Sequence, residues 1–272
     1  LLYATFVQVP ILHLGEAARD RRYLAAALVA NFVGVPAVVW ALGWLVPRDP
    51  AILLGLYMVL LVPCTDWFIV FTQLGRGDAR RAITSTPVML LAQVLLLPVY
   101  LWLFLGPALG EAVRAGPFLQ AFLLLILGPL LAAAATQAWA ERRAAGRRMI
   151  HRLAWLPVPC LAVVLFLIAF SQAGRVADHF KGMERILGVF VLYLILSAAI
   201  GLGTARVFRL PPAASRTLIF STGTRNSFVV LPLVLALPAG WESAVTVVVL
   251  QPLVELVGML AYLRWVPRWT AV

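Results

Sequence analysis

Two short polar stretches interrupt long apolar segments, and they hold the residues best suited to chemistry. The first is 63–66, with the sequence Pro-Cys-Thr-Asp, and the second is 224–227, with the sequence Thr-Arg-Asn-Ser. Each places a charge inside a segment long enough to cross a bilayer, where a charge costs about 3 kcal/mol or more and is kept mainly where it acts. Because a buried charge needs a partner, we expect Asp66 and Arg225 to pair where the two breaks cross, either as a structural ion pair or as a mobile gate.

Glu255 is the third charged residue well inside an apolar segment. With Asp66 and Arg225 assigned to each other, Glu255 has no partner of its own among the intramembrane residues. Burial disfavours the charged form of a carboxyl group, so such a group can load and release a proton near neutral pH. We therefore assign Glu255 as the candidate proton carrier. The alternative is a permanently protonated side chain bonded to a backbone carbonyl.

Of the two cysteines, Cys64 lies at the first break, whereas Cys160 lacks polar neighbours and is expected to be structural. A thiol beside exposed helix ends suits a soft, thiophilic solute, although most buried cysteines are simply small apolar side chains. Further polar residues could line the same cavity, or could instead hold helices together: Asn31, Thr65, Asn226 and Ser227.

The chain has none of the spacings typical of an enzyme. It contains no His-Glu-x-x-His, no glycine loop for phosphate and no convincing Ser/His/Asp arrangement. Its three histidines show no ligand spacing. We therefore expect no catalysis, no cofactor and no bound metal.

The composition is that of a polytopic membrane protein. Of the 272 residues, 63% are hydrophobic and 12% are charged, against about 25% charged in soluble domains. The 22 Lys and Arg exceed the 11 Asp and Glu, but they cluster in short loops between apolar segments. This pattern indicates membrane topology and contact with anionic headgroups of the lipid bilayer, and it argues against nucleic-acid binding.

Nine apolar segments have about the length that crosses a membrane. Alternate loops and the C-terminal tail are basic, which places them, and the C-terminus, in the cytoplasm. The chain starts without Met in an apolar run, so we expect one further helix before it, giving ten helices in two halves of five. The segments are 1–14 (incomplete), 23–46, 51–74, 82–105, 117–139, 153–171, 185–206, 213–237 and 242–265.

An odd number of helices in each half gives the two halves opposite orientations in the membrane. Residues 64–70 and 224–230 match in register, and each break falls in the fourth helix of its half. This is the inverted-repeat pattern of secondary transporters, whose interrupted helices cross near the midplane and present half-helix N-termini. The predicted fold class is therefore an all-α polytopic membrane protein with inverted five-helix repeats and two crossing interrupted helices.

The same stretches resemble the bile acid/sodium symporter superfamily, and within it the arsenical-resistance-3 branch of arsenite efflux permeases. The resemblance covers nearly the whole chain from the second helix onward, and it is carried by residues 61–65, 74–78, 224–228 and 251–255. It implies a panel made of 1–22 and 117–175, and a core made of 23–105 and 185–265.

In that branch, the cysteine at the first break and a glutamate of the last helix are associated with arsenite transport, and they fall on Cys64 and Glu255. The sodium-coupled relatives carry Glu-x-Gly-x-Gln-Asn where residues 221–226 read Ser-Thr-Gly-Thr-Arg-Asn. Ser221 thus replaces a carboxylate and Arg225 an amide. Because a cation site there loses its anion and gains a positive charge, the comparison disfavours sodium coupling and favours proton coupling through Glu255.

The leading hypothesis is a multi-pass exporter of trivalent arsenic, as oxyanion or hydroxide and including antimonite as a possible cargo, in the plasma (inner) membrane. It would exchange arsenite for protons, with Cys64 contacting arsenic and the Asp66–Arg225 contact holding or gating the crossing. One alternative is a sodium- or proton-coupled transporter of small organic anions in which Arg225 binds a carboxylate or sulfonate. Another is a membrane receptor or regulator that kept the fold without transporting.

Overall fold

The computed structural model describes residues 2–9, 20–106, 120, 123–156, 159–160, 163, 166 and 183–270. This part of the chain is helical, apart from turns and one isolated backbone bridge. The α-helices are α1 (Leu2–Gln8), α3 (Arg21–Val29), α4 (Val35–Leu42), α5 (Pro50–Leu60), α6 (Phe68–Leu74), α7 (Ala79–Leu105), α10 (Gly128–Arg142), α11 (Ala144–Leu153), α13 (Glu184–Val207), α14 (Pro212–Gly223), α15 (Ser227–Leu235) and α16 (Glu242–Trp269).

Five helical stretches of the described residues are long and apolar enough to cross a membrane. They are Arg21–Leu45, Ala79–Leu105, Leu123–Arg142, Glu184–Val207 and Glu242–Trp269. The first runs from α3 through a π-helical turn, Ala30–Gly34, and α4 into a short 3-10 helix, Gly43–Leu45. These spans agree closely with the predicted segments and confirm an all-α polytopic membrane protein. Most of the predicted segment 153–171 and residues 10–14 of the first predicted segment lie outside the described residues.

The two remaining predicted segments are broken, as expected, and the local sequence explains each break. The chain leaves helical geometry after Leu60 and re-enters it at Phe68, and Pro63, which has no amide hydrogen, lies in the gap. In the second break, the side chain of Asn226 accepts a hydrogen bond from the Val229 amide and so caps the start of α15. Helices α5 and α6 are therefore the two halves of the first interrupted segment, and α14 and α15 are the two halves of the second.

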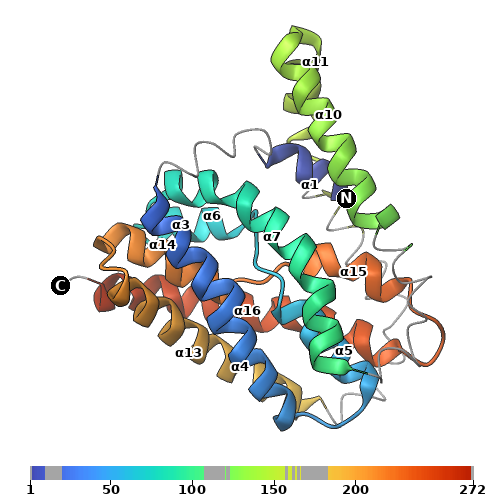
Figure 1. Cartoon of the computed structure of the whole chain (residues 1–272), viewed down its shortest axis with the longest axis vertical. Helices are drawn as coiled ribbons and strands as arrows, with labels where there is room; N and C mark the ends of the chain where they lie inside the picture. The colour runs from blue at the N-terminus through green and yellow to red at the C-terminus, as the bar shows by residue number, and fades with distance from the viewer. Residues whose placement is uncertain are drawn as a thin grey trace.

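Helix α16 passes through the middle of the bundle, where α5 and α15 pack against its N-terminal half and α13 and α14 against its C-terminal half (Figure 1). Small residues allow these close approaches. A Cβ added at Gly55 of α5 would lie 2.7 Å from the carbonyl oxygen of Ala244 in α16, and one added at Gly201 of α13 would lie 2.8 Å from the Cα of Ile219 in α14. The half-helices are thus wedged against continuous spans that fix their position.

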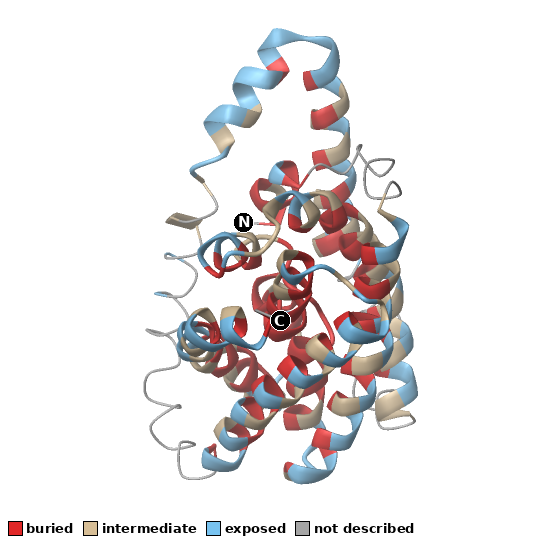
Figure 2. Ribbon diagram, turned by 90° about the vertical axis from the view of Figure 1, so that its left-hand side faces the viewer, coloured by how far each residue is buried: buried red, intermediate tan, exposed pale blue. Residues whose placement is uncertain are grey.

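Helices α10 and α11 form a hairpin that projects from the rest of the bundle, and most of its surface is exposed (Figure 2). The segment after the predicted span was expected to be a basic loop, but residues Ala144–Leu153 are helical. A cluster of helix-forming residues with an apolar stripe accounts for this difference. The side chain of Gln137 in α10 donates to the carbonyls of Val7 (3.0 Å) and Val9 (2.5 Å), which ties the end of α1 to the hairpin.

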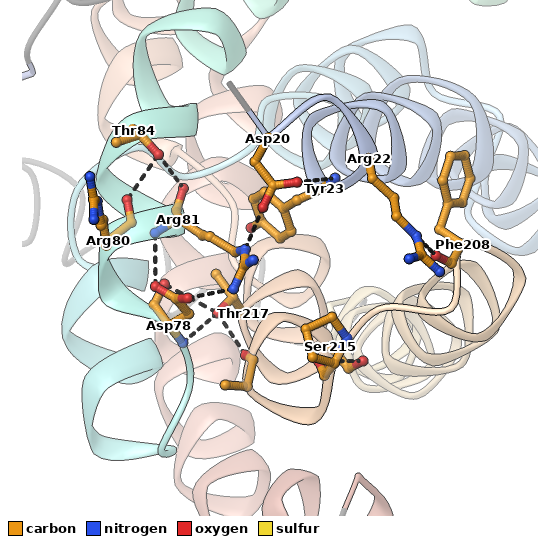
Figure 3. A network of polar contacts seen from close by, with 12 residues as sticks. Asp20, Arg22, Tyr23, Asp78, Arg80, Arg81, Thr84, Phe208, Ser215 and Thr217 are labelled. Carbon is orange, nitrogen blue, oxygen red and sulfur yellow. Dashed lines mark hydrogen bonds and ion pairs between the residues drawn. The ribbon is translucent and has the colours of Figure 1, made fainter. Parts of the chain in front are cut away.

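A polar network joins the starts of α3, α7 and α14 at one end of the bundle (Figure 3). Arg81 donates through Nε to Asp20 Oδ2 (2.7 Å) and through an Nη to Asp78 Oδ2 (2.6 Å). The Asp78 amide in turn donates to the Thr217 hydroxyl (2.7 Å). Partial burial by itself would raise the pKa of the Asp20 carboxyl, but hydrogen bonds from the Tyr23 amide and from Arg81 outweigh it and hold that pKa below its usual value.

The ends of α13 and α16 lie at this same end of the bundle. Arg22 at the start of α3 donates to the carbonyl of Phe208, which follows α13, and Arg216 of α14 donates to the hydroxyl of Thr270, which follows α16 (2.8 Å). Several loops that the sequence predicted on a single side of the membrane are therefore gathered at a single end of the molecule.

Candidate functional site

The two helix breaks cross and hydrogen-bond to each other through their backbones. Pro63 and Arg225 form an antiparallel bridge in which the Asn226 amide donates to the Val62 carbonyl (2.8 Å) and the Cys64 amide donates to the Thr224 carbonyl (3.2 Å). Backbone groups freed by a break have no water to bond to inside a bilayer, so they must find partners in the protein. Here the backbone of each break supplies hydrogen-bond partners for the other. These bonds confirm that the two interrupted helices cross.

The Arg225 side chain is almost completely buried, at 1% exposure, in a nest of oxygen atoms. One Nη donates to the carbonyls of Ser221 (2.7 Å) and Thr222 (2.9 Å), and the other donates to the carbonyl of Leu60 (3.3 Å). These carbonyls belong to the last turns of α14 and α5. The guanidinium therefore sits between the C-terminal ends of two half-helices, where the helix dipoles favour a positive charge.

Two further contacts complete the surroundings of Arg225. Asn31, in the π-helical turn between α3 and α4, accepts from a guanidinium Nη through its Oδ1 (2.8 Å), and its amide nitrogen lies 3.1 Å from the Ser221 hydroxyl. The ring of Tyr193 in α13 lies beneath the guanidinium, 5.7 Å from its central carbon. Arg225 is thus bound by four different helices without a carboxylate on its guanidinium among the described residues.

The predicted Asp66–Arg225 ion pair is absent from this structure. Asp66 Oδ1 instead accepts the Cys64 thiol (2.9 Å) and the Trp67 amide (2.7 Å). Asp66 lies just before α6, where a helix N-terminus favours a negative charge, whereas Arg225 lies at helix C-termini. Each charge is therefore matched by half-helix ends, and neither requires the other.

Glu255 is fully buried on α16 and is joined to the second break. Its Oε2 accepts the backbone amide of Arg225 (2.8 Å) and the side-chain amide of Gln251 (2.6 Å). The Ser227 hydroxyl donates to the other end of Gln251 (2.6 Å). The expectation that Glu255 lacks a partner is therefore wrong, although its Oε1 has no hydrogen-bond partner among the described residues.

Cys64 is buried, at 2% exposure, against Phe68 and Ala82, the latter in the first turn of α7. Next to it, the Thr65 hydroxyl accepts the side-chain amide of Asn226 (3.2 Å). Cys160 is only partly buried and has no place in this network. The described residues contain no group of three or more His, Cys, Asp or Glu side chains that could hold a metal ion.

The crossing thus gathers every predicted site residue into one connected region. The site residues predicted from the sequence did not include Gln251 beside Glu255, or the contributors around Arg225, which are Tyr193 and the carbonyls of Leu60, Ser221 and Thr222. Gln251 stands four positions before Glu255 on a helix, and this spacing is a recognisable signal for a side-chain contact. The contacts made by Tyr193 and by the backbone carbonyls depend on how separate helices pack, which no spacing in the sequence reveals.

Comparison with known proteins identifies the family. The family model described as Sodium Bile acid symporter family matches residues 1–179. The chain belongs to this family. It is also similar to the protein named Arsenical-resistance protein Acr3 of Corynebacterium glutamicum, with 21% identity over 281 aligned positions that cover 97% of this chain and 76% of that relative.

As a transporter of this family, the protein is an integral multi-pass membrane protein with a polar crossing at the centre of its helices. The crossing offers one thiol, one half-buried carboxylate beside it, one fully buried carboxyl and one fixed guanidinium. Such a set can bind a solute, hold a proton and balance charge while helices move. Its donors, acceptors and dipoles converge where two half-helices end, as binding sites of secondary transporters typically do.

Proposed function

We propose that this transporter exports trivalent arsenic in exchange for protons, with the solute bound at the crossing. The observation that carries the proposal is the Cys64 thiol, buried at the first break and hydrogen-bonded to Asp66. A thiolate is the ligand that soft, thiophilic elements prefer. The similarity to a protein named for arsenical resistance supports the same substrate class.

Asp66 gives the thiol a proton acceptor at 2.9 Å. When arsenous acid enters as the neutral trihydroxide, the thiol proton passes to the Asp66 carboxylate, sulfur forms a bond to arsenic, and one hydroxide leaves with that proton as water. A single sulfur–arsenic bond is reversed by water on the other side, which transport requires. The negative charge of Asp66 also favours the neutral acid over oxyanions, because like charges repel at short range.

The polar residues that the sequence predicted to bind substrate divide into two groups in this proposal. Thr65 and Asn226, which bond to each other next to Cys64, would contact the arsenic hydroxyls. Asn31 and Ser227 were also expected to bind substrate, but their side chains already bond to Arg225 and Gln251. We assign these two the role of holding the coupling residues in place.

Glu255 is the proposed proton carrier. Its carboxyl bonds to the Arg225 amide, which belongs to the same backbone bridge that holds Cys64. A change in its protonation therefore acts directly on the second break. A sodium ion has no role in this scheme, because the oxygen atoms that could surround a cation at the crossing already surround the guanidinium of Arg225.

The orientation follows from the distribution of arginines. The loops at the end where α3, α7 and α14 start are the basic ones, and basic loops remain in the cytoplasm. We therefore place this end and the C-terminus inside the cell, with the protein in the plasma (inner) membrane.

A second candidate function is the transport of small organic anions, which the family description favours. In that case Arg225 would bind a carboxylate or sulfonate through its Nε, which has no partner among the described residues. Its two Nη groups are engaged by carbonyls and Asn31, so an anion would have to displace these bonds. Flux of such an anion that is lost in Arg225→Gln would favour this candidate.

The deciding experiment is arsenite flux in everted vesicles with an imposed pH gradient and no sodium. We expect accumulation with the wild-type protein, and none with Cys64→Ser. Cys160→Ser is the matched control, because it removes the other thiol and should leave flux unchanged. No accumulation by folded wild-type protein, or equal flux in Cys64→Ser, would contradict the proposal.

A further inference from the structure

An apolar groove runs along the outside of the bundle between α13 and α16. Its volume is about 550 Å³, and aliphatic and aromatic side chains from both helices line it. The two helices are in close contact at Gly258, where an added Cβ would lie 2.4 Å from a side-chain carbon of Leu194. Behind this point, the Tyr262 hydroxyl donates to the Leu194 carbonyl. The groove, called the furrow below, therefore has a floor formed by direct contacts between the two helices.

The walls of the furrow are open to the surroundings. Ile195 of α13 is 61% exposed, and Val257 and Trp265 of α16 are 68% and 48% exposed. Both helices are long and apolar enough to span the membrane. This face consequently meets lipid chains along the length of the furrow.

One end of the furrow carries stacked aromatic rings and arginines. The rings of Trp265 and Trp269 stack with centroids 6.4 Å apart and an interplanar angle of 22°. Arg264 follows Ala261 of the lining by three positions, and Arg268 follows it by seven, so both arginines continue the same stripe of α16. Arg206, in the last turn of α13, lies at this end too. None of these arginines forms an ion pair with another described residue.

We propose that this groove binds one anionic phospholipid, with an acyl chain in the furrow and the phosphate headgroup against Arg264, Arg268 and Arg206. Charge complementarity selects the occupant, because the basic rim needs a negative headgroup and the furrow needs a hydrocarbon chain. Trp265 and Trp269 lie between the apolar furrow and the basic rim, and tryptophan is enriched where lipid headgroups meet the acyl chains. From Leu253 to Trp265 the helix rises about 18 Å, close to the roughly 15 Å hydrocarbon thickness of one leaflet.

The position of the groove connects a bound lipid to the crossing through a single helix, α16. Val254 lines the furrow, and the next residue, Glu255, bonds to the second break on the inner side of the same helix. The lipid therefore braces the outer face of α16. The proposal rests on the groove and its rim, and it holds whichever solute the crossing carries.

Fluorescence quenching tests the proposal on the intact protein. The protein is reconstituted in phosphatidylcholine vesicles containing either brominated phosphatidylglycerol or brominated phosphatidylcholine, because bromine quenches tryptophan on contact. Subtracting the signal of the double variant Trp265→Phe/Trp269→Phe isolates the stacked pair. We expect the pair to be quenched at a several-fold lower fraction of the anionic lipid than of the zwitterionic lipid.

Charge variants connect that preference to the rim. The double variant Arg264→Gln/Arg268→Gln should lose nearly all of this several-fold preference, because a single arginine near an anionic surface contributes about fivefold in binding. The matched control Arg21→Gln/Arg80→Gln removes the same charge from exposed arginines on α3 and α7 and should keep the preference. Equal quenching by both lipids would mean non-selective contact only, and would overturn the proposal. It would also be overturned by the absence of quenching at the pair, as when a second copy fills the groove, or by an undiminished preference in Arg264→Gln/Arg268→Gln.

Discussion

At the scale of the residue, the crossing shows how a membrane interior can accommodate opposite charges without pairing them. Arg225 is stabilised by carbonyls where α14 and α5 end, and Asp66 by an amide and a thiol where α6 begins. A charge at the end of a half-helix meets backbone groups that lack helical partners. The charge is thereby stabilised, and the backbone groups gain the hydrogen bonds that they would otherwise lack. The arrangement leaves Asp66 available to the Cys64 thiol.

Replacing Arg225 tests this description of the guanidinium. We expect Arg225→Gln to lower the free energy of unfolding by about 3 kcal/mol or more, because it leaves buried acceptors without a cation. Arg225→Lys should cost less, since it keeps the charge but reaches fewer oxygens. Thermal melting in detergent measures both. A melting temperature of Arg225→Gln equal to that of the wild type would show that these hydrogen bonds contribute little.

Replacing Glu255 tests its role as proton carrier. Glu255→Gln keeps an oxygen that can accept the Arg225 amide, so the fold should persist, but the side chain can no longer change charge. We expect arsenite accumulation driven by a pH gradient to disappear, while arsenite–arsenite exchange without a gradient continues. Both fluxes are measured in the same vesicles with labelled arsenite. An unaltered response to the gradient would remove Glu255 from the coupling mechanism.

At the scale of the element, the half-helices depend on tight packing against continuous spans. Helix α5 rests on α16 through Gly55, where a Cβ would come within 2.7 Å of one backbone atom of Ala244 and within 2.9 Å of another. Backbone atoms cannot rotate away as a side chain can, so any added atom must separate the helices. The end of α5, and with it the first break, would then move.

Two glycine variants separate packing from helix propensity. Gly55→Ala should lower the free energy of unfolding by about 1–3 kcal/mol through overpacking. Gly188→Ala, on α13, adds the same methyl group where nothing lies within 4 Å, and it should be neutral or raise stability slightly. Thermal melting of the two proteins in one detergent gives the comparison. Equal melting temperatures would mean that α5 can shift without cost.

At the scale of the whole molecule, proposed coupling and orientation lead to one joint expectation. Arsenite should accumulate in everted vesicles when their interior is acidic, and adding sodium should not change the rate, because Arg225 already provides the positive charge at the crossing. A reporter fused to the C-terminus should be reached by protease in everted vesicles, which turn the cytoplasmic side outward. A sodium-dependent rate, or a protected reporter, would contradict the coupling or the orientation respectively.

Much of the architecture could be predicted from the sequence because the bilayer restricts it so strongly. Apolar runs of spanning length predicted the helices to within a few residues, and Pro63 and Asn226 marked both breaks. The short helix Ala144–Leu153 was missed because its arginines indicated a loop. The inverted five-helix repeat stays a prediction, since it rests on the register of 64–70 with 224–230 and on the pattern of basic loops.

The sequence by itself determined that the chain spans the membrane and that two spans are broken. It also showed that Asp66, Arg225 and Glu255 are the charged residues well inside the spans, with Cys64 at the first break. Hydropathy and helix-breaking residues are local properties, so they can be read along the chain. Only the tertiary structure decided the partners. It gave Asp66 to Cys64, Arg225 to the ends of α14 and α5, and Glu255 to the Arg225 amide. The physical reason is that the carbonyls and amides freed by a break cannot be recognised in the sequence. Inside a bilayer they have no water to bond to, so they form hydrogen bonds with the charged side chains in place of other side chains.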